Sequence, residues 1–175
     1  MSVTARNPTL KLVLGAVVLA VLVVGWYLFR PELLFISKTV NEEPPKAAPA
    51  TSAVPSSPGP RIVAQGKFRG LAHETKGVAA IYRLPDGKRV LRLTEFETSN
   101  GPDVHVYLVR AADANDNAAV KKAGFVDLGS MKGNRGDQNY DVPVDIDLST
   151  HRSVSIWCAR FSVNFGVAPL MPERG

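Results

Sequence analysis

The stretch SVSIWCARFSVNFGV, residues 153–167, decides the fold class of this 175-residue chain. In both halves of it an apolar side chain takes every second position. Successive side chains of a β-strand point to opposite faces of the sheet, so a period of two indicates a strand with one buried face. We therefore expect strands at residues 153–158 and 161–167, with one face formed by Val154, Ile156, Cys158, Phe161, Val163, Phe165 and Val167.

The same alternation recurs upstream, at residues 89–96 and 104–109. Turn-forming residues separate the runs: Pro-Asp-Gly at 85–87, Asn-Gly-Pro at 100–102 and Gly-Asn-Arg-Gly at 133–136. Residues 111–123 are rich in Ala, Asp and Asn, a composition that fits either a helix or a long loop. About seven or eight short strands with turns between them predict an all-β domain, an antiparallel β-sandwich or a barrel-like fold.

A long apolar run precedes this domain. Residues 12–29, LVLGAVVLAVLVVGWYLF, contain no charged side chain. A helix rises ~1.5 Å per residue, so about 20 residues cross a hydrocarbon core of ~30 Å. A cleaved signal peptide would have a shorter apolar region that ends in small residues, whereas this run ends in the bulky Trp26-Tyr27-Leu28-Phe29. We expect an uncleaved transmembrane anchor helix at residues 10–30, after a short cytoplasmic tail at residues 1–9.

The charges that flank the run are nearly balanced. Arg6 and Lys11 precede it, and Arg30 and Lys38 follow it. Long C-terminal domains are translocated largely regardless of such charges. We therefore expect a single-pass membrane protein with its C-terminal domain outside the cytoplasm. In a bacterium this means the inner membrane, with the domain facing the periplasm or the outer surface.

Residues 31–60 are expected to form a flexible, proline-rich linker. The segment NEEPPKAAPATSAVPSSPGP, residues 41–60, has no aromatic residue and one branched aliphatic residue, Val54. It cannot bury enough apolar surface to offset the entropy lost on ordering, and its prolines favour an extended conformation. We expect it to act as a stalk that holds a single domain, residues 61–175, away from the bilayer.

Composition and motifs exclude several functions. The net charge of +5 is spread along the chain, and no basic stripe interleaved with aromatic residues indicates nucleic-acid binding. The sequence contains no phosphate-binding glycine loop, no paired-cysteine zinc spacing and no nucleophile elbow. The absence of a Cys-x-x-Cys pair excludes a thioredoxin-like centre and c-type haem attachment. These features do not indicate an oligomeric state, and they leave open whether the chain is an enzyme.

Cys158 is the only cysteine, and it has two interpretations. It is either a small buried apolar side chain on the face of Val154 and Ile156, or a redox-active thiol or thiolate ligand. If the strand continued, Arg160 would lie on the same face and favour the thiolate. A blue-copper centre would need a histidine and usually a methionine just after the cysteine. Met171 follows but no histidine does, so this signature fails.

Three histidines complete the set of candidate ligands. His105 shares a strand face with Tyr107 and Val109, where a lone histidine is either a hydrogen-bonded structural residue or a ligand. The preceding Gly101-Pro102-Asp103 combines backbone freedom, a fixed φ and a hydrogen-bond acceptor, and so either sets the strand register or orients a site. Neither His73 nor His151 lies in a motif that indicates a function. Tyr140 and Trp157 are expected to be core or rim aromatic residues.

Several stretches together resemble a known family. They are GPDVHVYLV at residues 101–109, GDQNYDVP at residues 136–143 and WCARFSVNF at residues 157–165. These resemble the DM-thirteen domain, also called the electron-transfer or Skeletor-type domain, and the resemblance spans nearly all of residues 65–170. It implies a β-sandwich-like extracytoplasmic domain whose hallmark cysteine aligns with Cys158. In animals such domains accompany DOMON domains and transmembrane cytochromes, which implies a redox role.

Two functional hypotheses follow. The first is a membrane-anchored electron-transfer domain with a redox protein as its partner and Cys158 as the redox residue. Within this hypothesis Cys158 and His105 are candidate ligands of a haem or metal cofactor, which no specific motif indicates. The alternative is a non-catalytic accessory binding or adhesion module in which Cys158 is structural.

Overall fold

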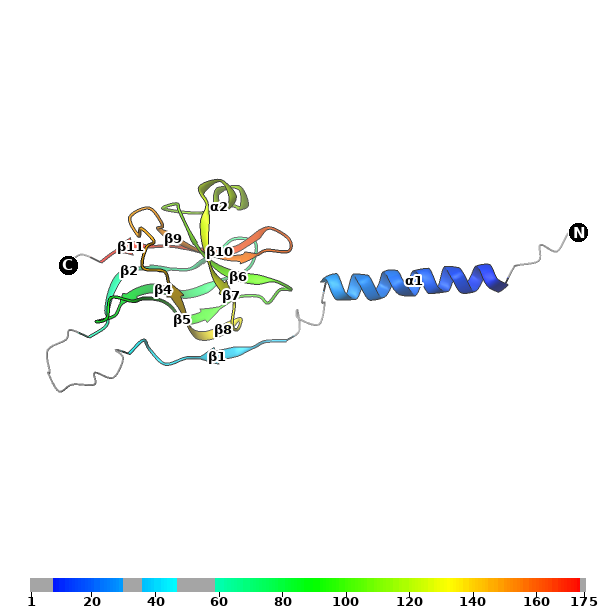
Figure 1. Ribbon diagram of the computed structural model, residues 1–175, viewed down its shortest axis with the longest axis horizontal. Helices are drawn as coiled ribbons and strands as arrows, with labels where there is room; N and C mark the ends of the chain where they lie inside the picture. Colours follow the sequence, from blue (N-terminus) through cyan, green and yellow to red (C-terminus); the bar gives the residue numbers. More distant parts are fainter. Residues whose placement is uncertain (1–7, 30–35, 47–58, 174–175) are drawn as a thin grey trace, which may run out of the picture.

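The structure is a computed structural model that describes residues 8–29, 36–46 and 59–173 (Figure 1). Within these residues the chain forms one long apolar helix followed by a β-rich domain. The helices are α1 (Pro8–Phe29) and α2 (Asn117–Ala123). The strands are β1 (Thr39–Asn41), β2 (Arg61–Lys67), β3 (Arg69–Gly70), β4 (Lys76–Arg83), β5 (Arg89–Glu97), β6 (Val104–Val109), β7 (Phe125–Ser130), β8 (Arg135–Val142), β9 (Ser153–Cys158), β10 (Val163–Pro169) and β11 (Met171–Pro172).

The strands of the described residues form two sheets that pack face to face. Sheet A has the order β1-β8-β5-β4-β2-β11, and sheet B has the order β3-β10-β9-β6-β7. All neighbouring strands are antiparallel except β1 and β8, which are parallel. The prediction of an all-β antiparallel sandwich preceded by one apolar helix is confirmed, and the domain is a sandwich rather than a closed barrel.

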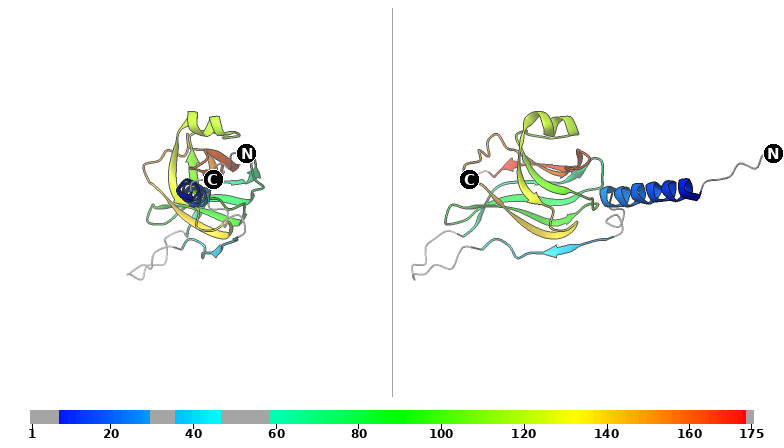
Figure 2. Two further views of the ribbon diagram at one scale, coloured as in Figure 1. Left: turned by 90° about the vertical axis from the view of Figure 1, so that its right-hand side faces the viewer. Right: turned by 45° about the vertical axis from the view of Figure 1, so that its right-hand side comes forward.

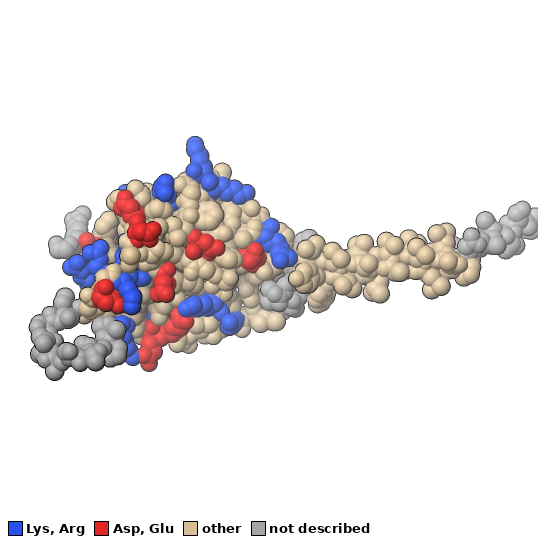
Figure 3. All heavy atoms as spheres, viewed as in Figure 1, with Lys and Arg blue, Asp and Glu red and all other residues tan. Residues whose placement is uncertain are grey.

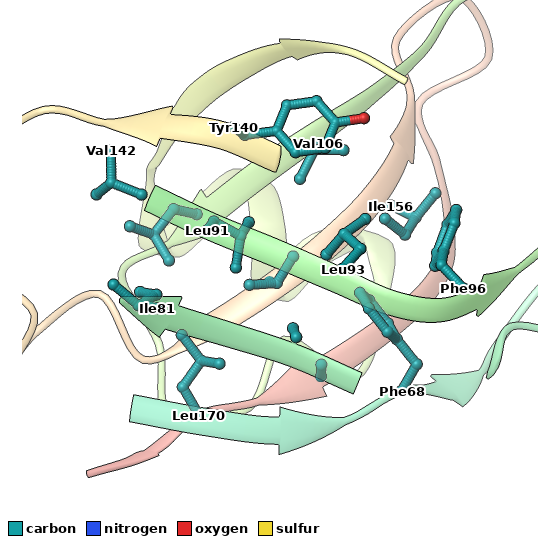
Figure 4. Close-up of a cluster of buried hydrophobic side chains, with 14 of the residues drawn as sticks. Phe68, Ile81, Leu91, Leu93, Phe96, Val106, Tyr140, Val142, Ile156 and Leu170 are labelled. Atoms are coloured by element: carbon teal, nitrogen blue, oxygen red, sulfur yellow. The ribbon is translucent and has the colours of Figure 1, made fainter. Parts of the chain in front are cut away.

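The side chains between the two sheets form the inner core. Alternation supplies it as expected: Leu91 and Leu93 come from β5, and Val106 and Ile156 come from β6 and β9 (Figure 4). Each buried side chain of this size stabilises the fold by roughly 1.5–3 kcal/mol relative to full exposure. The buried residues of the inner core are Ala64, Phe68, Ala79, Ile81, Leu91, Leu93, Phe96, Val104, Val106, Leu108, Tyr140, Val142, Val154, Ile156, Cys158, Phe165, Ala168 and Leu170.

A smaller apolar layer, the outer cluster, covers the other face of sheet B. Its buried residues are Tyr107, Val109, Ala114, Val120, Trp157 and Val167. Val120 belongs to α2, which the side chain of Asp116 caps by accepting a hydrogen bond from the backbone N of Ala119. The ambiguous segment 111–123 is thus a loop followed by a short helix.

Two β-bulges interrupt the predicted alternation. Between Leu93 and Phe96 the register of β5 shifts, with Glu95 at φ 50°, so that Phe96 faces the inner core. In β10 the register shifts between Asn164 and Gly166. Because a bulge adds one residue to one strand, it reverses the faces that follow.

The expected arrangement of the last long strand was therefore partly wrong. Phe165 packs in the inner core, whereas Val167 packs in the outer cluster. Phe161 does not begin the strand at all, because it lies in the turn of residues 159–162 that joins β9 to β10.

β1 also differs from the prediction. Thr39–Asn41 lies in the segment assigned to the linker, yet it pairs with β8 at the edge of sheet A. Since β1 is parallel to β8 and the next three pairs alternate in direction, β1 ends and β2 begins at the same end of the sheet. The stretch between them thus starts and finishes on the domain, and it does not separate the domain from α1. Residues 47–58, the centre of the expected stalk, lie outside the described residues.

Among the described residues, one helix is long and apolar enough to cross a membrane. Within residues 8–28 of α1, an 18-residue window has a mean hydropathy of 2.3, and none of this window is buried against the domain. Leu19, Leu22 and Trp26 are all more than half exposed. Figure 3 shows acidic and basic side chains interspersed over the visible face of the domain, whereas the visible face of α1 carries none. Composition and length alone are also compatible with a signal sequence.

Phe165→Ala tests the assigned face of β10. The ring is 4% exposed in the inner core, and its removal should cost about 3–5 kcal/mol of unfolding free energy. Phe161→Ala is the matched control, because that ring is 47% exposed and its loss should cost less than about 1 kcal/mol. Denaturant unfolding of the protein without its first 35 residues gives both values. Similar costs for the two variants would show that the bulge is misplaced.

Candidate functional site

Cys158 is the last residue of β9, and its side chain points into the inner core. In sheet B it stands opposite Val104 of β6 and Val163 of β10. The thiol forms no disulfide, and the residue is 1% exposed. The structure thus places Cys158 on the apolar face shared with Val154 and Ile156.

Arg160, the cation expected beside the thiol, does not share its face. β9 ends at Cys158, and Arg160 lies in the following turn. There its Nη1 donates a hydrogen bond to the carbonyl oxygen of Leu28 at 2.8 Å. A reactive thiolate needs nearby positive charge, hydrogen-bond donors or a metal, together with access. The surroundings of Cys158 are instead those of a packed apolar side chain.

His105 points to the opposite face of sheet B and lies between two carboxylates. Its Nδ1 is 2.9 Å from Oδ2 of Asp127, and its Nε2 is 3.1 Å from Oδ1 of Asp103. Burial by itself would lower the pKa of His105, but the hydrogen bonds and charges of Asp127 and Asp103 outweigh it and raise that pKa. The protonated ring donates from both nitrogens, so this triad holds the ring in one orientation.

Asp127 was not foreseen as a partner of His105. The register between β6 and β7 shifts between His105 and Tyr107, and the backbone there includes Gly129 at φ 115°. Oδ1 of Asp127 also accepts a hydrogen bond from the backbone N of Gly129 at 2.8 Å. In the sequence, Asp-Leu-Gly at residues 127–129 could have indicated a local bend. Only the pairing of β7 with β6 brings Asp127 next to His105.

The structure does not bring Cys158 and His105 together. The ladder pairs Cys158 with Val104, and it pairs His105 with Trp157. Because neighbouring residues of a strand face opposite ways, the thiol and the imidazole lie on different sides of sheet B. These two residues therefore do not fit a haem or metal that both would ligate.

No other metal centre replaces this pair within the described residues. They contain no group of three His, Cys, Asp or Glu side chains that could hold a metal ion. The triad at His105 does not qualify, since Asp127 and Asp103 sit on opposite ring nitrogens and do not converge on one point.

Aromatic rings extend from His105 across the outer face of sheet B. The ring of Tyr107 stacks on Phe125 at 4.0 Å with 6° between the planes, and its centroid lies 6.1 Å from that of Trp157. Phe125 is 42% exposed, whereas Tyr107 and Trp157 are buried. Burial and the charges of Asp127 and Asp103 raise the pKa of Tyr107 above its ordinary value. Trp157 is thus a core aromatic residue of the outer cluster.

The other two histidines are engaged locally. His73 packs on Phe165 with ring centroids 3.9 Å apart, and burial lowers the pKa of His73. It also lines a polar hollow of about 300 Å³. His151 is buried, with its Nδ1 3.0 Å from the carbonyl oxygen of Asp147.

The Gly101-Pro102-Asp103 segment has contacts that support a role in strand register. A Cβ on Gly101 would come within 2.8 Å of Cγ2 of Val104 and 3.2 Å of the ring of Phe165. The carbonyl oxygen of Asp103 accepts a hydrogen bond from the backbone N of Ala159 at 2.8 Å. This segment therefore ties the start of β6 to the turn after β9.

The residues Gln138 and Tyr140 form a buried polar network. The Tyr140 hydroxyl donates to Oε1 of Gln138 at 2.8 Å, and Nε2 of Gln138 donates to the carbonyl oxygen of Gly133 at 2.8 Å. Burial raises the pKa of Tyr140 to about 12. This network holds the turn between β7 and β8. Gln138 and Tyr140 therefore have a structural role.

A family model described as Electron transfer DM13 matches residues 67–170, which is more than half of the chain. The match agrees with the resemblance found in the sequence. No curated protein matched the chain, and no solved structure matched it.

His105→Gln tests the triad through the pH dependence of stability. The pKa of His105 is raised in the folded protein above its ordinary value of 6.5. Its stabilising effect is therefore present below about pH 6.5 and is lost as the pH rises through the folded-state pKa. The loss should not exceed about 1 kcal/mol, because both carboxylates are partly exposed to solvent.

The measurement is the difference in unfolding free energy between wild type and His105→Gln from pH 5 to 9. Taking the difference removes the contribution of His73, whose lowered pKa acts with the opposite sign. A difference that stays constant with pH would show that His105 is not held by Asp103 and Asp127.

Proposed function

The chain belongs to the electron-transfer DM13 family, and from this premise we propose that it is an electron-transfer domain held at a membrane by α1, with the sandwich on the extracytoplasmic side. The extent of the family match carries the proposal. Residues 67–170 include every strand from β3 to β10, which is all of sheet B and the three strands β8, β5 and β4 of sheet A rather than a local motif. The partner of such a domain is a second redox protein that exchanges electrons with it.

The anchor is supported by the form of α1. Its 22 residues rise about 33 Å, enough to cross a hydrocarbon core of ~30 Å. Trp26 and Tyr27 stand at its C-terminal end with 61% and 75% of their surface exposed, where an interfacial aromatic belt would lie. The bulky residues there also disfavour cleavage by a signal peptidase.

Cys158 is the redox candidate within this domain. It is the only cysteine, it lies inside the matched residues, and the exposed turn of residues 159–162 follows it directly. A redox role requires that the thiol be reached when the turn opens, because in the closed fold the residue is 1% exposed.

The second candidate function is an accessory binding or adhesion module with a structural cysteine. Its supporting observation is the burial of Cys158 in the inner core, opposite Val104 and next to the partly buried Val163. In such surroundings a free cysteine behaves as a small apolar side chain. The two candidates therefore differ in whether the domain exchanges electrons through the sulfur of Cys158 or binds a partner without any redox step.

The anchor is tested by topology. A reporter that is active only outside the cytoplasm, fused after Gly175, should be active, and the full chain should stay in the membrane fraction after alkaline extraction. Replacing Leu19 and Leu22 by arginine should release the protein, because each charge at the bilayer centre costs about 2.5–3.5 kcal/mol. A shorter, soluble wild-type form would instead identify α1 as a cleaved signal.

The role of Cys158 is tested by comparing the wild type with two variants of this residue. The native thiol should resist alkylation at neutral pH and react once guanidinium unfolds the protein. If Cys158 carries electrons, Cys158→Ser should abolish electron exchange with a one-electron mediator, measured by voltammetry, and leave the circular dichroism spectrum unchanged. If it is structural, Cys158→Ala should lower stability by roughly 1–2 kcal/mol, and neither variant should differ from wild type in its response to the mediator.

Val104→Ala is the matched control for these variants. Val104 faces Cys158 across β6 and β9, so its truncation disturbs the same part of the inner core and keeps the sulfur. Loss of electron exchange in Val104→Ala as well would mean that packing, and not the thiol, supports the activity.

A further inference from the structure

We propose that the end of the sandwich formed by Ile36 and the β9–β10 turn is a lipid-contacting surface, which β1 holds against the bilayer. The proposal rests on α1 being the membrane anchor. It assigns an interaction surface and its partner, the lipid interface, to a part of the chain that carries no other role.

The length of chain between α1 and the domain limits their separation. α1 ends at Phe29, and the domain holds the chain again from Lys38, whose backbone N donates to Oδ1 of Asn134 at 2.7 Å. Nine residue steps span at most roughly 32 Å even when fully extended. If α1 crosses the bilayer, this end of the domain cannot move farther than that from the lipid headgroups. Figures 1 and 2 show α1 leaving from this end, while the C-terminus lies at the other.

The limit holds only because β1 is firmly attached, and Glu42 is its main attachment. The backbone N of Glu42 donates to the carbonyl oxygen of Asp137 at 2.9 Å. Its carboxylate accepts from Nζ of Lys132 at 2.8 Å and from the backbone N of Asn139 at 2.6 Å. Nη1 of Arg92, a buried residue of β5, donates to the Glu42 carbonyl oxygen at 3.0 Å. β1 is short, but these contacts fix its end to the sheet.

Two glycines show that the sheet edge is shaped to receive β1. A Cβ on Gly133 would lie 2.4 Å from the carbonyl oxygen of Lys38, and one on Gly136 would lie 2.2 Å from that of Val40. Both distances are far below van der Waals contact, so any side chain at these positions would push β1 away. At Gly136 a side chain would also be strained by the backbone, which has φ +92°. At Gly133 only the lack of space rules out a side chain.

The surface that faces α1 combines exposed apolar groups with a cation. Ile36 is 52% exposed, and its carbonyl oxygen accepts from Nδ2 of Asn100 at 3.2 Å, which ties it to the turn before β6. Phe161 is 47% exposed in the β9–β10 turn. Beside it, Arg160 reaches the last turn of α1 through the Leu28 carbonyl oxygen. Aromatic rings and basic side chains are the groups that favour a membrane–water interface.

This placement also deepens the proposed function. Cys158 directly precedes the turn that carries Arg160 and Phe161, so the redox candidate would lie on the membrane side of the domain. Contact with lipid would exclude soluble reagents from the turn and favour partners that are themselves in the membrane.

The test uses the full chain in vesicles of phosphatidylcholine and phosphatidylglycerol. An environment-sensitive fluorophore is attached to Phe161→Cys in a Cys158→Ser background, or in Cys158→Ala if the serine variant does not fold. The control site is Val144→Cys, because Val144 is 69% exposed and follows β8, which runs away from the α1 end. Spin-labelled lipids should quench the fluorophore at residue 161 several-fold more than at residue 144. Equal quenching at the two sites, or none at residue 161, would overturn the proposal.

A second comparison tests the role of β1. Gly133→Ala should displace β1 and reduce quenching at residue 161, whereas Gly59→Ala should not, because a Cβ on Gly59 meets nothing within 4 Å. Unchanged quenching in Gly133→Ala would refute the holding role of β1. Loss of the wild-type protein from the vesicles on alkaline extraction would overturn the anchor and this surface together. Retention without quenching would overturn the surface alone.

Discussion

The pairing of β6 with β9 is the interaction on which the rest of the domain depends. β9 lies in the middle of sheet B, and all six of its residues are buried. Its register sets Cys158 opposite Val104 and Trp157 opposite His105. A slip by one residue would reverse every side chain, moving the thiol to the outer face and the indole into the inner core. The separation of Cys158 from His105 is thus a property of the strand register and not of local packing.

This separation gives the two faces of sheet B different chemistry. The inner face is apolar and keeps Cys158 from solvent, whereas the outer face carries the charged triad of His105 and the exposed ring of Phe125. In an electron-transfer domain the outer face can meet a partner without any change in the core. A thiol in the inner face is shielded from soluble reagents, because Cys158 is 1% exposed.

At one edge of sheet A, β1 pairs with β8, and this pairing fixes where the chain from α1 joins the domain. An unpaired strand edge exposes backbone donors and acceptors that invite association with other chains. Here β1 covers β8, and Glu42 satisfies Lys132 and Asn139 in the same place. The strand comes before the proline-rich stretch in the chain, so that stretch cannot act as a spacer between α1 and the sandwich. The segment nearest the helix therefore covers the edge of β8 and attaches the chain to the domain soon after α1.

The sequence by itself determined the elements whose cause is local. The periods of two at residues 104–109 and 153–158 match β6 and β9, and the uncharged run at residues 12–29 lies within α1, because side-chain alternation and hydrophobicity act within a few residues. Only the tertiary structure decided the bulges that place Phe165 and Val167 on opposite faces, the pairing of Asp127 with His105, and the attachment of β1 to β8. Each of these depends on a partner strand distant in sequence, whose register and bulges no local pattern encodes.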